Sequence, residues 1–420
     1  MIENKQYRVR KSEVTSPREL PEIIRQSLAK NTLRWYVAQV THDEYVIEAT
    51  NIAEDRNQIE LPTERSYCPG KRVVLSVIPT GIGSDIGGYA GDAAPATNLL
   101  ASAVDYLITN PNAVNASDFV GLNQDNIIYA DGCCIDMFCQ GLADLHIPYS
   151  NRIGLIIEKC DDRELDVIFN VVNAVRAVHG VQLTDILITD QAIGGRCVEN
   201  QTGAFVGTVD NPGILLHSCE KLIQRGATAL AVTTNIRDLP LDNYAKHFEG
   251  KYPNPIGGVE AVISYLITDT FHVPAAHAPL LNVKQLDLKH RVIDARGAGE
   301  MVSESGLACV LVGLRKAPQI HPNSNVRMKD ILSLNNLITV VSPASCLGGI
   351  SAIYAQKYNI PVIAVQENHT ILDVTKSKMG LDNVIEVHNY AEAAGVILAL
   401  SKGINLEALS RPLTTLRYKY

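Results

Sequence analysis

The sequence predicts an α/β protein with two doubly wound lobes of mostly parallel sheet, preceded by a small α+β unit. Short, β-branched apolar runs alternate with helical stretches from Lys71 onward. Such alternation is typical of parallel strands that are joined by helical crossovers. These runs are too numerous for one compact sheet, which indicates two lobes. Residues 1–69 follow a different pattern, a helix and a hairpin, which sets them apart from the rest.

The chain is long enough, at 420 residues, to form more than one domain. We expect a small α+β unit over residues 1–69, an α/β lobe with a glycine-rich loop over 70–250, and a second α/β lobe over 251–420. The boundary between the lobes is expected within 234–260 or near residue 330. Periodicity predicts the following strands and helices. The strands are 73–78, 106–109, 127–129, 152–158, 185–189, 229–233, 309–313, 337–341, 361–365 and 384–387, and the helices are 164–179, 212–224, 258–267 and 349–358.

The N-terminal unit begins with a helix signal. Ser16, Pro17 and Glu19 have the spacing of an N-cap, a first-turn proline and a capping box, and the helix is expected over residues 20–28. Residues 34–40 and 45–50 read as two antiparallel strands, with Trp35 as a core or interface residue rather than a ligand platform. We expect no chemistry in this unit and expect the remainder of the chain to fold without it.

Composition narrows the class of function. The net charge is −8, from 37 basic and 45 acidic residues, so we expect neither a nucleic-acid partner nor an anionic membrane. No apolar run approaches a membrane span, and the N-terminal residues lack the apolar stretch of a signal peptide. We therefore expect a cytoplasmic protein whose nine cysteines are reduced. The cysteines form no C-x-x-C pair, and we expect no metal site.

A glycine-rich loop follows the first predicted strand of the α/β region. Gly81, Gly83, Gly87, Gly88 and Gly91 precede Asp92, after which helical spacing resumes. A strand, a glycine loop and a helix present backbone N–H groups to an anion. The loop matches neither the phosphate-binding nor the dinucleotide-binding fingerprint, and Asp92 would repel a bare anion. The sequence favours a loop that contacts ligand through Gly81, Gly83, Gly87 and Gly88, although the glycines would also suit a turn that binds nothing.

Polar residues follow other predicted strands, where ligands of such folds bind. Asn110 and Asn112 are candidate substrate-binding residues, and their alternative role is in a turn. Asp190 is a candidate acid or base, and Arg196 a candidate substrate-binding residue. Their alternative role is a plain ion pair. His277 is a candidate acid, base or ligand because imidazole titrates near neutral pH.

The loop around Cys346 follows a strand and opens a helix. A cysteine at a helix N-terminus gains a lower thiol pKa, and free N–H groups there can hold an oxyanion. Glu367 and His369, after the next strand, are placed to act as its base, and Asn368 is a candidate substrate-binding residue. Two alternatives stay open. The segment that includes Ser345, Gly348 and Gly349 would serve as a non-covalent anion cradle, or Cys346 would be a packed small residue.

Several motifs together resemble an uncharacterised domain-of-unknown-function family that is common in photosynthetic organisms and also occurs in other bacteria. The resemblance is carried by Ile78-Pro-Thr-Gly-Ile-Gly and Ile86-Gly-Gly-Tyr-Ala-Gly-Asp, and by Leu107-Ile-Thr-Asn-Pro-Asn, Ala275-Ala-His-Ala-Pro, Val310-Leu-Val-Gly-Leu with Ala317-Pro-Gln, and Ile363-Ala-Val-Gln-Glu-Asn. It spans about residues 71–410 and leaves the N-terminal 70 residues as an addition. It implies no settled activity.

These features predict an enzyme of small-molecule metabolism that binds a polar, anionic substrate between two α/β lobes. The expected reaction is that of a hydrolase, lyase or transferase that works by acid–base chemistry without nicotinamide, flavin or another cofactor. The alternatives are a ligand-binding sensor with no turnover and a structural subunit. A homo-oligomer is compatible with the sequence. We expect at least three of Asp92, Asp190, His277, Cys346 and Glu367 to share one ligand pocket, because carboxyl ends of parallel strands lie on one side.

Overall fold

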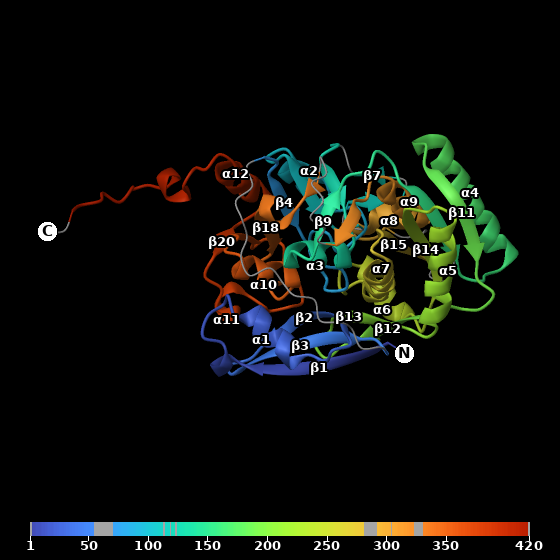
Figure 1. The fold of residues 1–420 in the computed structure, drawn as a ribbon, viewed down its shortest axis with the longest axis horizontal. Coiled ribbons are helices and arrows are strands. Elements are labelled where there is room, and N and C mark those ends of the chain that lie inside the picture. Colours follow the sequence, from blue (N-terminus) through green and yellow to red (C-terminus); the bar gives the residue numbers. More distant parts are fainter. Residues whose placement is uncertain are drawn as a thin grey trace.

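The computed structural model describes residues 2–53, 70–111, 114–117, 119–121, 124–280, 292–303, 305–322 and 331–418. It confirms the predicted α/β class: two large sheets lie between helices, and a smaller N-terminal sheet packs along one side of both (Figure 1). The C-terminal segment after α12 (Tyr390–Ser401) extends away from the body of the protein (Figure 1).

The first large sheet is entirely parallel. Its six strands lie in the order β20-β19-β18-β4-β5-β8. They are β4 (Val73–Ser76), β5 (Tyr106–Thr109), β8 (Ile127–Tyr129), β18 (Leu337–Pro343), β19 (Val362–Val365) and β20 (Val384–Val387). Their apolar, mostly β-branched side chains are buried on both faces, as expected for a parallel sheet covered by helices.

The second large sheet is mostly parallel. Its path is β11-β10-β14-β12-β13, and a further strand, β15, pairs with β14. The strands are β10 (Arg152–Ile157), β11 (Gln182–Ile188), β12 (Gly195–Glu199), β13 (Phe205–Val209), β14 (Ala229–Arg237) and β15 (Ala275–Leu280). Only β12 and β13 pair antiparallel among these neighbours.

The two sheets divide the chain differently from the expected lobes of 70–250 and 251–420. Residues 73–129 and 337–387 together form the first sheet, and residues 152–280 form the second. In particular β4 and β18 are hydrogen-bonded neighbours, with Leu75 opposite Val340. A division of the chain near residue 250 therefore separates strands that belong to one sheet. Hydrophobic periodicity locates a strand but does not identify its neighbour.

Helices cover the sheets. The larger ones are α3 (Gly132–Gln140), α4 (Asp162–His179), α5 (Pro212–Gln224), α7 (Gly257–Phe271), α9 (Leu307–Leu314), α10 (Ile350–Lys357) and α12, and the shorter ones are α2 (Ala94–Ala101), α6 (Leu241–Phe248), α8 (Ala298–Val302) and α11 (Lys376–Met379). The small strands β9 (Ala143–His146), β16 (Gln319–Pro322) and β17 (Ile331–Leu332) form one sheet, and β6 (Asn115–Ala116) pairs with β7 (Phe119–Val120).

Most strand and helix predictions agree with the structure, and the misses share one cause. The predicted strand 309–313 is wrong, because these residues lie within α9. Strands β15, which contains His277, and β13 of the second sheet were not predicted. Short apolar runs suit either a buried strand or a buried helix, so tertiary packing decides between them.

The N-terminal unit is a three-stranded antiparallel sheet with one helix. Its strands β1 (Glu3–Arg10), β2 (Thr32–Val40) and β3 (Glu44–Asn51) lie in the order β1-β3-β2, and α1 spans Leu20–Ser27. Helix α1 and the β2–β3 hairpin follow the prediction, whereas β1 was not predicted. The third strand adds the pairing that a marginal hairpin lacks.

This unit is joined to the rest of the chain by hydrogen bonds and by a shared core. The N–H of Val37 donates to the carbonyl of Gly348 at 2.9 Å, and the hydroxyl of Tyr45 donates to the carbonyl of Met379 at 3.1 Å. Leu20 and Ile24 of α1 belong to the same buried cluster as Tyr354 of α10. These contacts argue against the expectation that the remainder folds independently of the unit.

Among the described residues, no single helix is both long and apolar enough to cross a membrane. One pair of helical segments, Ala295–Val302 and Leu307–Leu314, qualifies together on length and composition alone, and the two are bent by 90° relative to each other.

Removing residues 1–69 tests the shared core. We expect the shortened chain to aggregate or to lose several kcal/mol of unfolding free energy, since burial of each large aliphatic side chain contributes about 1.5–3 kcal/mol. Thermal melting and gel filtration measure the outcome. As a control, removal of residues 411–420, a segment exposed wherever it is described, should leave the melting temperature unchanged. A soluble, cooperatively melting chain that starts at residue 70 would contradict the expectation.

Candidate functional site

A cavity of about 220 Å³ lies where the N-terminal sheet covers the junction of the two large sheets. Its walls are the ends of β4, β5 and β8 with the segments that follow them, the first turns of α3 and α7, and parts of β13 and β15. The segment 346–351 and residues 34–37 of β2 complete the enclosure. The cavity is therefore at the carboxyl ends of first-sheet strands, where ligands bind in α/β folds.

Asp131 anchors the floor of the cavity. It follows β8 and caps α3, where its Oδ1 accepts hydrogen bonds from the N–H groups of Cys133 at 2.9 Å and Cys134 at 3.1 Å. Its Oδ2 accepts from the hydroxyl of Thr268 at 3.0 Å, and the backbone N–H of Ala275 also donates to the carboxylate. Burial nevertheless raises the pKa of Asp131 to about 6.

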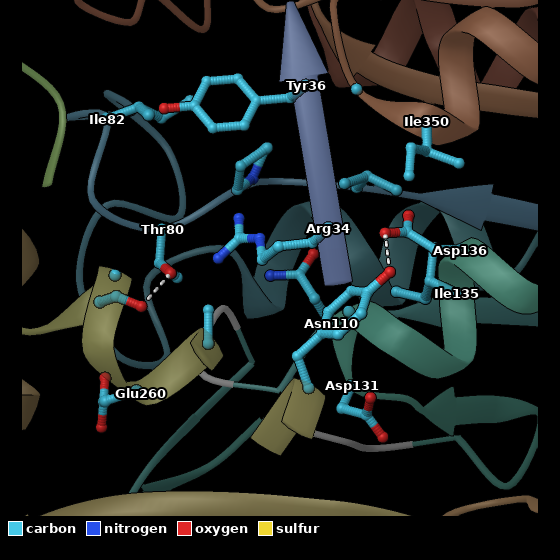
Figure 2. Close-up of a pocket in the computed structure, with 18 of the residues that line it drawn as sticks. Arg34, Tyr36, Thr80, Ile82, Asn110, Asp131, Ile135, Asp136, Glu260 and Ile350 are labelled. Carbon is cyan, nitrogen blue, oxygen red and sulfur yellow. Dashed lines mark hydrogen bonds between the residues drawn. The ribbon is translucent and has the colours of Figure 1, made fainter. Parts of the chain in front are cut away.

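Asp136 lies farther along α3 and faces the cavity. Its Oδ2 accepts a hydrogen bond from the hydroxyl of Tyr265 at 3.2 Å, which is the dashed line at Asp136 in Figure 2. Enclosure by protein raises the pKa of Asp136 to about 7, and the nearby Arg34 guanidinium opposes this rise. A carboxyl group that titrates near neutral pH is suited to both proton donation and proton acceptance.

Arg34 extends from β2 into the middle of the cavity (Figure 2). It is the only lysine or arginine in the lining, within the part of the chain that the structure describes. Its guanidinium carbon lies 6.0 Å from the centre of the Tyr265 ring. No described residue forms a hydrogen bond or an ion pair with the guanidinium group, which leaves its donors available to a ligand.

His277 and Glu260 form another part of the wall. The Nε2 of His277 is 2.9 Å from the hydroxyl oxygen of Thr234, and its Nδ1 is 3.5 Å from Oε1 of Glu260. The His277 side chain is buried, whereas Glu260 retains 20% side-chain exposure. Both residues line the cavity, so the predicted candidate His277 is placed beside a carboxylate that the sequence analysis did not select.

The glycine-rich loop packs closely against neighbouring backbone. A Cβ atom on Gly81 would lie 2.9 Å from the carbonyl oxygen of Phe205, and one on Gly88 would lie 2.2 Å from that of Ser84. The cavity is lined by Thr80 and Ile82 of this loop rather than by its glycines. Gly83 and Gly88 instead line a second pocket of about 250 Å³ beside Arg296 and His247. Close packing thus accounts for the glycines at 81 and 88 without a ligand.

Asp92 and Gly87 are packed within the same loop. Gly87 has a φ of +91°, and a Cβ there would lie 2.6 Å from a methyl carbon of Ile78. The Oδ1 of Asp92 accepts from the N–H of Tyr89 at 3.3 Å, and burial raises the pKa of Asp92 to about 7. Burial likewise raises the pKa of the neighbouring Glu300 to about 7. Neither carboxyl group is part of the cavity lining.

Five of the predicted site residues line the cavity: Asn110, His277, Cys346, Gly348 and Gly349. Asn110 is already committed to the backbone, since its side chain accepts from the N–H of Ile78 at 2.9 Å and donates to the Ile78 carbonyl at 2.7 Å. Gly348 accepts the hydrogen bond from Val37 described above.

The remaining predicted residues lie elsewhere. Asp190 and Glu367 are exposed, at the ends of β11 and β19, toward the edges of their sheets. Arg196 is paired with Asp210 and Asp238. Other positions serve local structure or fall outside the description. Asn368 is buried and bonds the backbone of Ile86, Ser345 bonds the hydroxyl of Thr370, and Asn112 lies outside the described residues.

At least three of the five groups Asp92, Asp190, His277, Cys346 and Glu367 were expected to share one pocket. Two of them, His277 and Cys346, line the cavity. The strand-end rule holds for β4, β5 and β8 of the first sheet, whose following segments line the cavity, but β19 and β11 end away from it. Glu367 follows β19, which is separated from β4 by β18, and Asp190 follows the edge strand β11.

The environment of Cys346 differs from that expected of a nucleophile. Its thiol is buried, and burial raises its pKa to about 12. Helix α10 begins only at Ile350. The expected base His369 is on the surface, with its Nδ1 2.9 Å from Oδ2 of Asp85. Desolvation disfavours the thiolate and outweighs any effect of the helix dipole.

The sequence analysis missed Arg34, Asp131, Asp136, Glu260 and Tyr265. Asp131 could have been found, because it comes directly after the predicted strand 127–129 and precedes a helical stretch. The others lie within regular elements rather than at strand ends, and only the packing of these elements brings them together. No group of three or more histidine, cysteine, aspartate or glutamate side chains that could hold a metal occurs among the described residues.

Fold and site define an α/β protein with a cavity at the junction of its two large sheets. A profile of the family described as a protein of unknown function, DUF3326, matches residues 73–410, and the chain belongs to this family. The chain is also 34% identical over 339 residues to an uncharacterized lipoprotein of Synechococcus sp., an alignment that covers 80% of this chain and 92% of the relative. The sequence-based assignment to an uncharacterised family is thus confirmed.

The raised pKa of Asp136 predicts how the unfolding free energy of the protein depends on pH. Its ordinary value is 3.8 and its value in the folded protein is about 7, so the folded state binds the proton more tightly than the unfolded state. The resulting stabilisation is complete below about pH 4 and is lost as the pH rises to about 7. Relative to Asp136→Asn, we expect the wild-type unfolding free energy to fall by roughly 1.4 kcal/mol per pH unit over this window.

Urea unfolding of both proteins at pH 5, 6, 7 and 8 measures this difference. Asp166→Asn, which changes an exposed aspartate on α4, is the matched control. Its unfolding free energy should depend on pH in the same way as that of the wild type. If the unfolding free energy of Asp136→Asn also follows that of the wild type with pH, the prediction is wrong. Asp136 would then have the same pKa in the folded and unfolded states.

The burial of the Cys346 thiol predicts slow alkylation in the folded protein. In the native protein at pH 8, we expect Cys346 to react with iodoacetamide at least about a hundredfold more slowly than in denatured protein, because only the thiolate reacts. Peptide mass spectrometry after timed labelling measures the rate. Rapid labelling of Cys346 in the folded protein would restore it as a candidate nucleophile.

Proposed function

We propose that the protein is an enzyme that performs acid–base chemistry on a small, polar, anionic molecule held in the cavity. The observation that carries the proposal is the group formed by Asp136, Tyr265 and Arg34 in the lining of the cavity. An acid–base catalyst needs a titratable group near the working pH and within reach of the substrate. Asp136 meets the first condition through burial and the second through its place in the lining.

The proposed roles follow from charge and hydrogen bonding. The hydroxyl of Tyr265 donates a hydrogen bond to Asp136 and fixes the orientation of the carboxyl group. Arg34 supplies the positive charge that attracts an anionic substrate, and its presence favours the ionised form of Asp136. Asp136 then takes a proton from the bound molecule, or gives one to it, at the neutral pH where both forms are populated.

The reaction class stays that of a hydrolase, lyase or transferase without nicotinamide or flavin. The burial of Asp136 supports chemistry at low local polarity, which strengthens interactions between charges. We place the enzyme in the cytoplasm, where a reducing environment suits its nine cysteines. The charge balance of the chain supports a small-molecule partner rather than a nucleic acid.

A defined mixture of small hydroxy, oxo and amino acids tests the proposal. Purified wild-type protein and Asp136→Asn are each incubated with the mixture at pH 7, and mass spectrometry follows every component. We expect one component or a few related ones to be consumed by the wild type, and turnover to fall at least about a hundredfold in the variant.

Asp166→Asn serves as the control for general effects of preparation and charge. A component that binds both proteins but is converted by neither would favour the alternative of a non-catalytic ligand sensor. Equal turnover by wild type and Asp136→Asn would remove Asp136 from the chemistry.

A further inference from the structure

We propose that the N-terminal unit, residues 2–53, selects the ligand of this cavity. In this proposal, Arg34 binds a carboxylate of the ligand, and the wall formed by Glu260 and His277 binds a hydroxyl or amine donor on the same molecule. The ligand class is therefore a small hydroxy or amino carboxylic acid. The inference rests on the proposed function to the extent that the cavity is the place where substrate binds.

The charges of the cavity lining support a single anionic contact. The lining contains three carboxyl groups, Asp131, Asp136 and Glu260, and one guanidinium group. Asp131 is saturated by hydrogen bonds from protein groups, and Asp136 is held by Tyr265. Arg34 has no such partner among the described residues. A guanidinium group presents a planar fork of donors that matches the two oxygens of a carboxylate.

The geometry argues against a purely structural role for Arg34. A structural arginine in this position would be expected to form an ion pair with Asp136, yet no described ion pair joins the two. The Arg34 side chain instead lies over the ring of Tyr265, and Figure 2 shows it extending into the open part of the cavity. An unpaired, partly buried charge is costly, and an anionic ligand would remove this cost.

Glu260 and His277 require a hydrogen-bond donor on the ligand. Glu260 accepts hydrogen bonds but donates none when ionised, and its described side-chain contact is Nδ1 of His277, 3.5 Å away and not hydrogen-bonded to it. The Nδ1 of His277 likewise has no hydrogen-bond partner among the described residues. A hydroxyl or amine group on the ligand supplies the donor that Glu260 lacks. The remaining lining is largely apolar, with Trp35, Ile82 and Ile350 among its members, and suits a short carbon skeleton.

The position of Arg34 in the chain gives the N-terminal unit its proposed role. The family match begins at residue 73, so Arg34 lies outside it, whereas Asp131, Asp136, Glu260 and His277 lie inside it. The unit is held over the cavity by the bond from Val37 to Gly348 and by a bond from the amide of Asn200 to the hydroxyl of Tyr36 at 3.0 Å. A family member without this unit would have no counterpart of the Arg34 charge.

Three probes with the same carbon skeleton test the two contacts separately. Lactate carries a carboxylate and a hydroxyl, propionate carries only the carboxylate, and propane-1,2-diol carries only hydroxyls. Ligand-observed NMR titration of the full-length protein at pH 7 measures each affinity. We expect lactate to bind more tightly than propionate, and propane-1,2-diol to bind at least about tenfold more weakly than lactate, as expected for loss of one charge-assisted bond.

Variants then assign the carboxylate contact to Arg34. In Arg34→Gln we expect lactate to weaken about tenfold or more while propane-1,2-diol is unaffected, and in Arg34→Lys we expect part of the lactate affinity to return. Arg10→Gln, at an exposed position of the same N-terminal sheet, is the matched control and should bind all three probes as the wild type does. Circular dichroism of each variant checks that the fold is retained.

Two results would overturn the inference. One is equal affinity of the wild type for lactate and propane-1,2-diol, and the other is unchanged lactate affinity in a folded Arg34→Gln. Because these are binding measurements, they are separate from the turnover comparison of wild type with Asp136→Asn. Selective binding without turnover would support the proposed ligand class and contradict the proposed enzyme activity. Turnover without Arg34-dependent binding would support the enzyme activity and contradict the proposed role of Arg34.

Discussion

The structure depends on one buried carboxylate, that of Asp131, at the junction of its two large sheets. Asp131 follows β8 at the edge of the first sheet and caps α3, while Thr268 of α7 and the backbone of Ala275 in β15 donate to it from the side of the second sheet. A buried charge of this kind is tolerated only when hydrogen bonds satisfy it. Removing the carboxylate would leave its donors on α3, α7 and β15 unpaired, so Asp131 ties together three elements that line the cavity.

The chemistry of the cavity follows from its enclosure. Burial, rather than a neighbouring charge of the same sign, is the main cause of the raised pKa of both Asp131 and Asp136. Their roles differ because their hydrogen bonds differ. Asp131 is occupied by backbone and hydroxyl donors, whereas Asp136 accepts a hydrogen bond from Tyr265 alone among the described residues and faces the cavity. The same low polarity makes the unpaired Arg34 charge significant, since an opposite charge on a ligand is attracted more strongly there than in water.

The N-terminal sheet shows how an added unit can take part in a site that belongs to a family domain. The domain covered by the family match supplies the floor and walls, and the added sheet supplies the cover with its one cation. The bond from Val37 to Gly348 places the cover directly on the segment that contains Cys346. This contact explains why Cys346 is buried and has a raised thiol pKa, although its position in the chain resembles that of an activated cysteine.

Local pattern in the sequence determined the α/β class, the family, and most strands and helices. Helix 212–224 and strands 106–109, 127–129 and 384–387 match the structure to the residue, because their apolar periodicity acts over short distances. Pattern also selected the segment around Gly348, which follows the carboxyl end of β18, and His277, which lies within β15. Only the tertiary structure decided which strands pair across 73–129 and 337–387, and that Arg34, Asp136 and Tyr265 meet. The physical reason is that strand pairing and side-chain burial depend on contacts between residues far apart in the chain. The pKa of a side chain is perturbed only when such contacts bury it, and local sequence pattern does not record them.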